Sequence, residues 1–285
     1  MTKLDQFEST FRAAAKETYT RTPLKIDRVL VATDLEPVDA ARLTEAARRF
    51  LVAIDRPETV WEPLAGSAFD SVQALLEQVE AHKPDLIVTY RHLHSNAWHW
   101  PYSLGEHLDV LTQATATPIL VLPHPDAGRG LPHSVQDTNV VMAITDHLVG
   151  DARLVDAALG FTAAGGTCWL SHVERAADFE RYIDVISKIP MIDTETAAET
   201  INAQLLKEPH DYIRSCRAAI EAAGLNVSIE EIVVMGRRIE EYTRLIEAHE
   251  VDLLVMHAKD EDQLAMHGLA YPLAVELRQI PLLML

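Results

Sequence analysis

The chain has 285 residues, of which 48% are hydrophobic and 24% are charged; this composition excludes a disordered chain, and the length predicts two domains of about 150 residues each. Its 25 Lys and Arg against 43 Asp and Glu give a formal net charge of −18, which argues against nucleic-acid and anionic-membrane partners because their phosphates require clustered basic side chains. Two cysteines, Cys168 and Cys216, are too few for a disulfide framework and are typical of a reducing compartment.

The chain begins with an amphipathic segment. We predict an N-terminal helix over residues 1–22, ended by Pro23. Its apolar face is formed by Leu4, Phe7, Phe11 and Ala14. The charged start lacks the apolar segment of a signal peptide, and no stretch approaches the ~20 apolar residues of a membrane span. We therefore expect a soluble, cytoplasmic protein.

Short apolar runs then alternate with segments of helical periodicity, which is typical of βαβ units in a parallel sheet. Arg28–Thr33 and Asp85–Thr89 are predicted as buried strands of the first part of the chain. Residues 124–137 are rich in Pro and Gly and are predicted to form a linker. A further buried strand, Asn139–Thr145, opens the second part.

Four segments of the first part recur later in the same order. Val31–Asp34 recurs as Ala143–Asp146, Ala41–Leu43 as Ala152–Leu154, Ala81–Val88 as Ala248–Val255, and Pro118–Leu122 as Pro281–Leu285. Repetition of this kind predicts a duplicated domain. Matching segments differ in residue number by 111 at Ala41–Leu43 and by 167 at Ala81–Val88. Between these two segments the second copy therefore carries 56 residues that the first lacks.

The repeat defines the predicted domains. A truncated copy over residues 26–123 precedes the linker, and a complete copy over residues 138–285 follows it. The additional residues include a predicted strand at Thr167–His172 and a predicted helix over Ile201–Ala223, which ends before Gly224. The first copy therefore lacks one strand and its crossover helix.

The order of these motifs resembles the universal stress protein family in its tandem, two-domain form. The resemblance rests on opening strands that end in Thr33-Asp34 and Thr145-Asp146, on Asp-Leu-Ile/Leu-Val, and on a glycine, a short helix and Pro-(Ile/Leu)-Leu before the last strand. It implies an α/β fold of two Rossmann-like domains of the adenine nucleotide alpha hydrolase type, with parallel sheets and strand order 3-2-1-4-5 in the complete copy. It also implies a cytoplasmic stress-response protein.

The same resemblance implies assembly through the last strands, here as a pseudo-dimer within one chain. The exposed strand edge of the truncated copy would also allow a homodimer. We expect a small-molecule ligand of unknown identity and neither a nucleic-acid nor a membrane partner.

Many members of that family bind ATP through a glycine-rich loop whose backbone amides approach the phosphates. Only the last glycine of that loop matches here, as Gly105 and Gly268. The hydroxyl position that follows is occupied by Glu106 in one copy and Leu269 in the other. A carboxylate repels a phosphate and a leucine cannot donate to one, so both loops are predicted to be degenerate.

Asp34 and Asp146 match the aspartate that faces the adenosine in the family. Adenine-nucleotide binding by the second copy, through Asp146 and Gly268, is therefore the alternative to a non-catalytic binding or interaction protein without a cofactor. No Ser-His-Asp constellation, Walker sequence or pair of catalytic carboxylates is defined by the spacing, so no catalytic residue is predicted.

Four histidines are expected near the carboxyl edge of the second sheet, namely His147, His172, His257 and His267. Imidazoles beside a carboxylate are ligands for zinc or another borderline metal, and they also act as acid–base groups near neutral pH. The sequence therefore offers a metal-binding or acid–base enzyme as a further alternative. The plainer interpretation is that these side chains are solvated or bonded to backbone.

An aromatic and histidine-rich segment, Tyr90–Tyr102, replaces the glycine loop of the first copy. One interpretation is a lid that stacks on a planar ligand or holds a metal through His92 and His94. The interpretation we favour is that Trp98, Trp100 and Tyr102 pack on protein, because aromatic side chains bury large areas.

Overall fold

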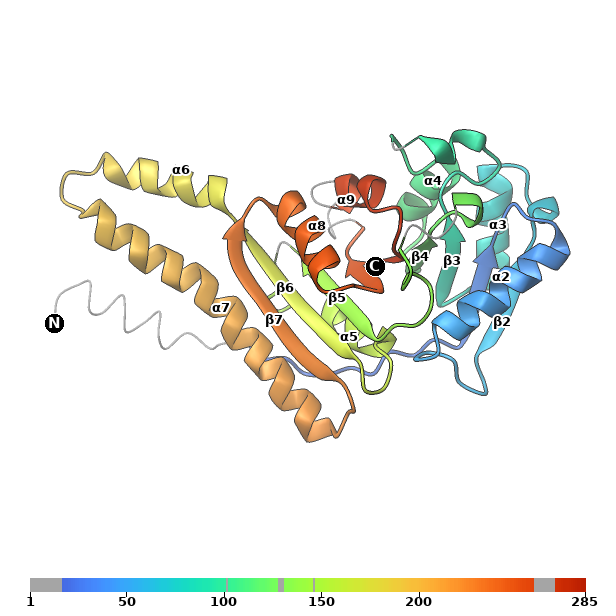
Figure 1. Ribbon diagram of the computed structural model, residues 1–285, viewed down its shortest axis with the longest axis horizontal. Coiled ribbons are helices and arrows are strands. Elements are labelled where there is room, and N and C mark those ends of the chain that lie inside the picture. The colour runs from blue at the N-terminus through green and yellow to red at the C-terminus, as the bar shows by residue number, and fades with distance from the viewer. Residues whose placement is uncertain (1–16, 101, 128–130, 146, 259–269) are drawn as a thin grey trace.

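The computed structural model describes residues 17–100, 102–127, 131–145, 147–258 and 270–285. Strands and helices alternate throughout this part of the chain (Figure 1). The N-terminal half contains β1 (Arg28–Ala32), α2 (Pro37–Phe50), β2 (Val60–Leu64), α3 (Val72–His82), β3 (Leu86–Tyr90), α4 (Glu106–Ala114) and β4 (Ile119–Leu122). Short 3-10 turns occur at Gly66–Ala68, Asn96–His99 and Pro125–Ala127.

The C-terminal half begins with β5 (Val140–Thr145). It continues with α5 (Ala152–Phe161), β6 (Thr167–Arg175), α6 (Ala176–Ser187), α7 (Thr194–Ala223), β7 (Ser228–Gly236), α8 (Arg238–Ala248), β8 (Leu253–Met256), α9 (Ala270–Glu276) and β9 (Leu282–Met284). Gly224 follows α7 with a φ of 65°, as its position in the sequence predicts. The helix α6 was not predicted from the sequence.

One sheet of nine strands runs through the described residues, in the order β2-β1-β3-β4-β9-β8-β5-β6-β7. Neighbouring strands are parallel except β4 and β9, which are antiparallel with Leu120 opposite Leu283. The predicted α/β fold with a mostly parallel sheet is thus confirmed. The sheet is continuous across both halves of the described chain, because the fully buried strands β4 and β9 pair with each other and so leave neither of these two edges open.

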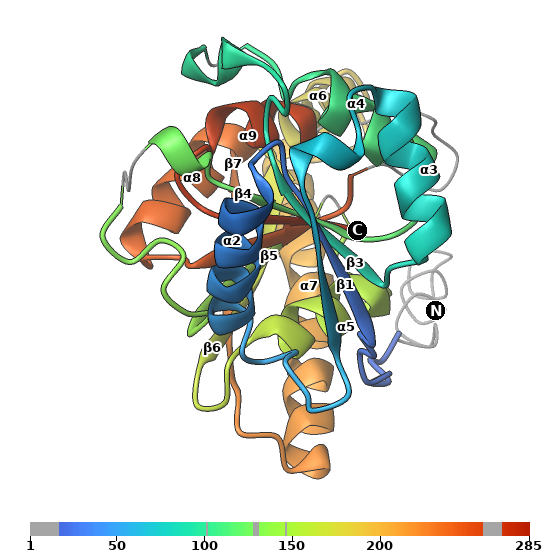
Figure 2. The same cartoon turned by 90° about the vertical axis from the view of Figure 1, so that its right-hand side faces the viewer.

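Helices cover both faces of this sheet (Figure 2), so the central strands are buried on both sides. Side chains alternate between the two faces along each strand. Val29 and Val31 pack in one core cluster and Leu30 in the other, and Met142 faces away from Val141 in the same way. Cys168 and Cys216 are free thiols in the first of these clusters, where burial raises the pKa of each to about 12.

Both halves share one arrangement at the amino end of their first strand. The backbone amide of Asp85 donates to the carbonyl of Arg28 at 2.9 Å, and the Asp85 carboxylate accepts the amide of Arg28 at 2.9 Å. In the C-terminal half, Asp252 makes the same two bonds to Val140, at 2.9 and 2.8 Å. The aspartate of the repeated Asp-Leu-Ile/Leu-Val motif therefore fixes the start of a strand.

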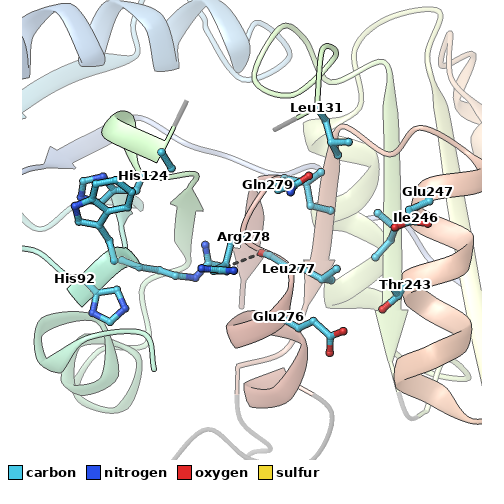
Figure 3. Close-up of a pocket in the computed structure, with 14 residues that line it drawn as sticks. His92, His124, Leu131, Thr243, Ile246, Glu247, Glu276, Leu277, Arg278 and Gln279 are labelled. Carbon is cyan, nitrogen blue, oxygen red and sulfur yellow. Dashed lines mark hydrogen bonds between the residues drawn. The ribbon is translucent and has the colours of Figure 1, made fainter. Parts of the chain in front are cut away.

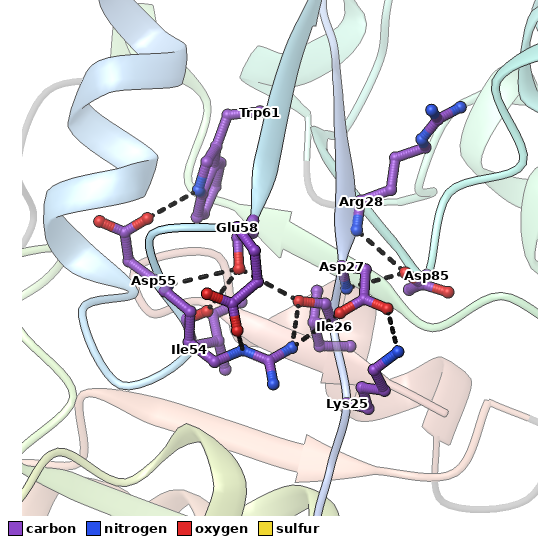
Figure 4. A network of polar contacts seen from close by, with 11 residues as sticks. Lys25, Ile26, Asp27, Arg28, Ile54, Asp55, Glu58, Trp61 and Asp85 are labelled. Atoms are coloured by element: carbon purple, nitrogen blue, oxygen red, sulfur yellow. Dashed lines mark hydrogen bonds and ion pairs between the residues drawn. The ribbon is translucent and has the colours of Figure 1, made fainter.

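A polar network surrounds this end of β1 and β2 (Figure 4). Arg56 donates to the carbonyl of Ile26 at 2.8 Å and pairs with Asp27 at 3.0 Å. Asp55 accepts bonds from Arg48 and from the Trp61 indole. The network lies at the end of the sheet opposite to the carboxyl ends of the parallel strands, and it supports the fold there.

The segment before β1 differs from its prediction. Residues 17–27 contain no helix, and the rest of the predicted N-terminal helix lies outside the described residues. The buried Tyr19 packs edge-on against Tyr212 of α7, and its hydroxyl donates to Asp156 of α5. The Thr22 amide also donates to Asp156, at 3.0 Å. The Thr22 amide is thus used in a contact with the C-terminal half and not in a helix.

The helices α6 and α7 form an arm that extends away from the sheet (Figure 1). Asp193 begins α7, since its side chain accepts the amide of Glu195 at 3.2 Å. Within the described residues, no helix combines the length and the apolar character that a membrane span requires.

Candidate functional site

The carboxyl ends of β1 and β3 meet at one edge of the sheet, where Asp34 and Tyr90 are in contact. The hydroxyl of the fully buried Tyr90 donates to one carboxylate oxygen of Asp34. The other oxygen accepts the backbone amide of His94 at 2.8 Å. Burial raises the pKa of Tyr90, and the adjacent Asp34 carboxylate raises it further, so the phenol remains a donor. Both oxygens of Asp34 are therefore used within the protein.

The retained glycine of this half, Gly105, lies at the N-terminus of α4 with a φ of 89°. A Cβ added there would lie 2.7 Å from the Cα of His92. The amide of His92 also donates to the carbonyl of Leu104 at 3.0 Å. Glycine is thus required by close packing of two backbone segments, and this explains its presence without a phosphate.

The first turn of α4 carries two acidic side chains, Glu106 and Asp109. Burial raises the pKa of Asp109. Helix N-termini favour bound anions through their free amides and their dipole. Carboxylates in that turn stabilise the helix and oppose a second anion, so this end of α4 is poorly suited to a triphosphate.

The loop that replaces the glycine-rich loop contains two histidines in the left-handed region, His92 with a φ of 61° and His94 with a φ of 56°. The rings of His94 and His107 both lie edge-on to the buried Phe69, at centroid distances of 5.0 and 6.0 Å. Burial lowers the pKa of His107, and nearby His94 lowers it further. Side chains of this loop and of its neighbours thus fill the crevice above β1 and β3.

In the C-terminal half, Asp146, His267 and Gly268 lie outside the described residues. His147 is exposed after β5. His172 pairs with Glu174 at 3.1 Å and His257 with Asp151 at 2.8 Å. Among the residues that the structure describes, no three His, Cys, Asp or Glu side chains are grouped closely enough to hold a metal ion.

The His257–Asp151 pair also has a structural role. Asp151 begins α5, and its second carboxylate oxygen accepts the amide of Leu154 at 3.0 Å. His257 follows β8 and so connects the end of a strand to the start of a helix across the crevice. The pair brings together an imidazole and a carboxylate, which is the minimum for acid–base chemistry.

A cleft with a volume of about 440 Å³ lies between the two halves (Figure 3). Its lining residues from the N-terminal half include Arg91, His92, Trp98 and His124. Those from the C-terminal half include Thr243 and Glu247 of α8, and Glu276 and Arg278 at the end of α9. Burial lowers the pKa of both His92 and His124, which favours neutral imidazoles in the lining.

Arg91 lies at the junction and is 3% exposed. Its guanidinium donates to the carbonyl of Ala274 at 2.6 and 3.1 Å and to that of Leu277 at 2.7 Å. Burial lowers the pKa of Arg91 to about 9, with a smaller contribution from Arg278, so the side chain remains charged at neutral pH. The sequence analysis did not identify Arg91, although an arginine directly after a strand predicted to be buried is an available signal.

The aromatic segment is only partly explained by packing. Trp98 stacks on His99 at a centroid distance of 3.7 Å and on His124 at 4.6 Å. Trp100 and Tyr102 are 64% and 77% exposed. The packing interpretation therefore holds for Trp98 and is wrong for the other two, which extend into solvent beyond the end of the 3-10 turn.

No protein-family model matches the sequence, and no curated protein matches it either. Among solved structures, the chain is similar to a functionally unknown protein from Pseudomonas aeruginosa PAO1, with 13% identity and a TM-score of 0.53 over 91% of this chain and 92% of that chain. It is also similar to a provisionally assigned universal stress protein from Pseudomonas aeruginosa UCBPP-PA14, with 14% identity and a TM-score of 0.53 over 91% and 93% of the two chains. The predicted resemblance to universal stress proteins is thus confirmed at the level of the fold.

Proposed function

We propose that this chain is a non-catalytic binding protein of the universal stress protein type, acting in the cytoplasm in a stress response. The crevice of its first domain does not accept ATP. The observation that carries this proposal is the carboxylate of Asp34, which is occupied by the Tyr90 hydroxyl and the His94 amide. Each oxygen of this aspartate already accepts a hydrogen bond from within the protein, and these two donors occupy positions that an adenosine would need.

The proposal includes two tandem domains, residues 26–123 and 138–285, joined as a pseudo-dimer within one chain. The matching bonds of Asp85 and Asp252 to the first strand of each half support the repeat. The antiparallel pairing of β4 with β9 supports assembly through the last strands. Reading from β7 to β9, the C-terminal strands lie in the order β7-β6-β5-β8-β9, which is compatible with the order 3-2-1-4-5.

We place the small-molecule ligand in the cleft between the halves. Its lining combines the guanidinium of Arg278 with the carboxylates of Glu247 and Glu276 and with apolar side chains such as Ile246. Mixed charge fits a small polar molecule that carries both an anionic and a cationic or donor group. Two carboxylates in the lining disfavour a triphosphate.

Two other candidate functions concern the second domain. Adenine-nucleotide binding there would depend on Asp146 and Gly268. Acid–base or metal chemistry would depend on the four histidines, and the 2.8 Å contact between His257 and Asp151 is the observation that favours it. Zinc analysis of the purified protein, with and without His257→Ala, tests the metal.

Calorimetric titration with Mg·ATP separates these functions. The proposal expects either no binding, or binding that is unchanged in Asp34→Ala and lost in Asp146→Ala. The second outcome would assign ATP to the second domain and leave the first closed. ATP binding that Asp34→Ala abolishes, in a variant whose circular dichroism and melting temperature match the wild type, would overturn the proposal.

A further inference from the structure

The cleft between the two halves contains a buried cation that does not use all of its hydrogen-bond donors. Arg91 is almost fully buried, and its Nε and Nη2 donate to the carbonyls of Ala274 and Leu277. Within the described part of the chain, its third nitrogen, Nη1, donates to no acceptor. Nη1 is also not one of the unpartnered polar atoms that are sealed from solvent. Because Arg91 lines the cleft, the two N–H groups of Nη1 can be reached from it.

No carboxylate neutralises this charge. Neither Arg91 nor Arg278 forms an ion pair with any residue that the structure describes. Burial is the main cause of the lowered pKa of Arg91, and the charge of Arg278 lowers it further. Burial is likewise the main cause of the lowered pKa of His92, to which both arginines contribute. Two neighbouring guanidinium groups without a counter-charge are a setting that a bound anion stabilises.

The rest of the lining is largely apolar. Leu131, Ile246 and Ile280 line the cleft, and all three belong to, or pack against, the same core cluster. Glu247 of α8 lies across the cleft from His92 (Figure 3). A molecule in this cleft therefore meets two cations at the junction of the halves and an apolar surface beside them.

The other charges of the lining favour an anion with a single negative charge. Arg91 and Arg278 share the lining with Glu247 and Glu276. A dianion such as a phosphate ester brings a second negative charge toward these carboxylates. A ligand carboxylate has one negative charge, and its two oxygens accept charge-assisted hydrogen bonds from guanidinium groups.

We propose that the cleft binds a monocarboxylate with an apolar body, and that the carboxylate lies against Nη1 of Arg91 and the guanidinium of Arg278. This inference rests on the proposed function, which places a small-molecule ligand in the cleft. It adds the chemical class of the ligand and the side chains that hold its anionic end. Because Arg91 joins α9 to β3, a carboxylate bound there stabilises the junction, and binding is expected to raise the melting temperature.

The test is titration of the full chain with hexanoate, a monocarboxylate with an apolar chain, followed by ligand-observed NMR. We expect a dissociation constant on the order of 1 mM, as is typical of a ligand of this size. 1-Hexanol has the same chain without the charge, and hexyl phosphate has a second charge. Both are expected to bind at least about tenfold more weakly, since a charge-assisted hydrogen bond is lost or a repulsion is added.

Arg278→Ala isolates the contribution of the second cation, because Arg278 is exposed and bonded to no described residue. The variant is expected to weaken hexanoate binding at least about fivefold and to leave 1-hexanol binding unchanged. Arg181→Ala is the matched control, since Arg181 is an exposed arginine of α6 outside the cleft. Arg91→Ala removes a contact of the junction together with the donor, so the test depends on Arg278→Ala.

Hexanoate that fails to bind at about 20 mM overturns the inference. Binding that Arg278→Ala leaves unchanged does so as well, and so does hexyl phosphate that binds more tightly than hexanoate. Failure of the proposed function is recognised separately. ATP binding that Asp34→Ala abolishes would overturn that function and leave a carboxylate site at Arg278 standing, whereas absence of both ATP and hexanoate binding would overturn the ligand class alone.

Discussion

The guanidinium of Arg91, at the end of β3, donates two hydrogen bonds to the backbone carbonyl of Ala274 in α9, a residue 183 positions later in the sequence. The side chain also reaches Leu277 at the end of the same helix. A positive charge at a helix C-terminus satisfies carbonyls that have no intrahelical donor and interacts favourably with the helix dipole. Arg91 therefore fixes the C-terminal half against the N-terminal half.

Arg91→Ala is expected to lower the free energy of unfolding by about 3 kcal/mol, because it removes the charged donor and leaves buried carbonyls unsatisfied. The measurement is urea denaturation followed by circular dichroism. Arg278→Ala, an exposed arginine in the same cleft, is the control and should change stability by less than about 0.5 kcal/mol. Equal effects of the two substitutions would contradict this role of Arg91.

Tyr90→Phe tests the contact with Asp34. The substitution keeps the ring and removes the hydroxyl, so Asp34 loses a donor in a half-buried setting, and stability should fall by about 2 kcal/mol. Thermal unfolding of the variant gives the magnitude. Tyr102→Phe removes a hydroxyl from a side chain that is 77% exposed and should leave the melting temperature unchanged. A stable Tyr90→Phe protein would show that the contact contributes little.

Gly105→Ala tests whether glycine is required at this position because a Cβ would clash with the His92 backbone, or only because the backbone has a positive φ. The new Cβ would lie 2.7 Å from the His92 backbone, so we expect a loss of at least about 3 kcal/mol. Gly224→Ala is a matched control, since Gly224 has a φ of 65° and no atom within 4 Å of the added Cβ; it should lose only about 1 kcal/mol. Denaturant titrations of both proteins measure the difference, and similar losses would remove the steric explanation for Gly105.

Asp252 predicts a dependence of stability on pH. Burial is the main reason that its pKa is raised to about 6 in the folded protein, against about 3.9 in an unfolded chain. Below about pH 3 the group is protonated in both states and has no effect. As the pH rises from 4 through 6, ionisation favours the unfolded chain, and the folded protein loses up to about 3 kcal/mol.

Asp252→Asn keeps an acceptor for the amide of Val140 and removes this ionisation. The variant should therefore gain stability over the wild type at pH 7, and this gain should shrink to about 0.5 kcal/mol at pH 4. Urea denaturation at the two pH values measures the gain. Asp85→Asn is the control at the corresponding exposed position. A gain of the same size at both pH values would contradict the explanation.

Several features of the fold were predictable because they depend on neighbours in the sequence. The strand near Val29 and the strand near Leu254 are continuous apolar runs, and such runs are buried in a parallel sheet. Gly224 ends α7 because glycine readily adopts the left-handed backbone conformation found there. The repeated aspartates at 85 and 252 were visible as a motif, although the backbone bonds that explain them were not.

The candidate site was less predictable. The sequence identified Asp34 and Gly105 by position, but it did not reveal that Tyr90 and His92 use them inside the protein. The expected histidine cluster also depends on side-chain direction: His172 and His257 each pair with a nearby carboxylate. Spacing along the chain specifies which edge of a sheet a residue occupies, and packing decides what it contacts.

The sequence by itself determined the alternation of strands and helices and the absence of a glycine-rich loop, because periodicity and residue type act over a few neighbouring positions. Only the tertiary structure decided that β4 and β9 join two halves into one sheet, that Arg91 reaches Ala274, and that α6 keeps an apolar face in solvent. These contacts link residues far apart in the chain, and their stability depends on the surfaces that folding brings together.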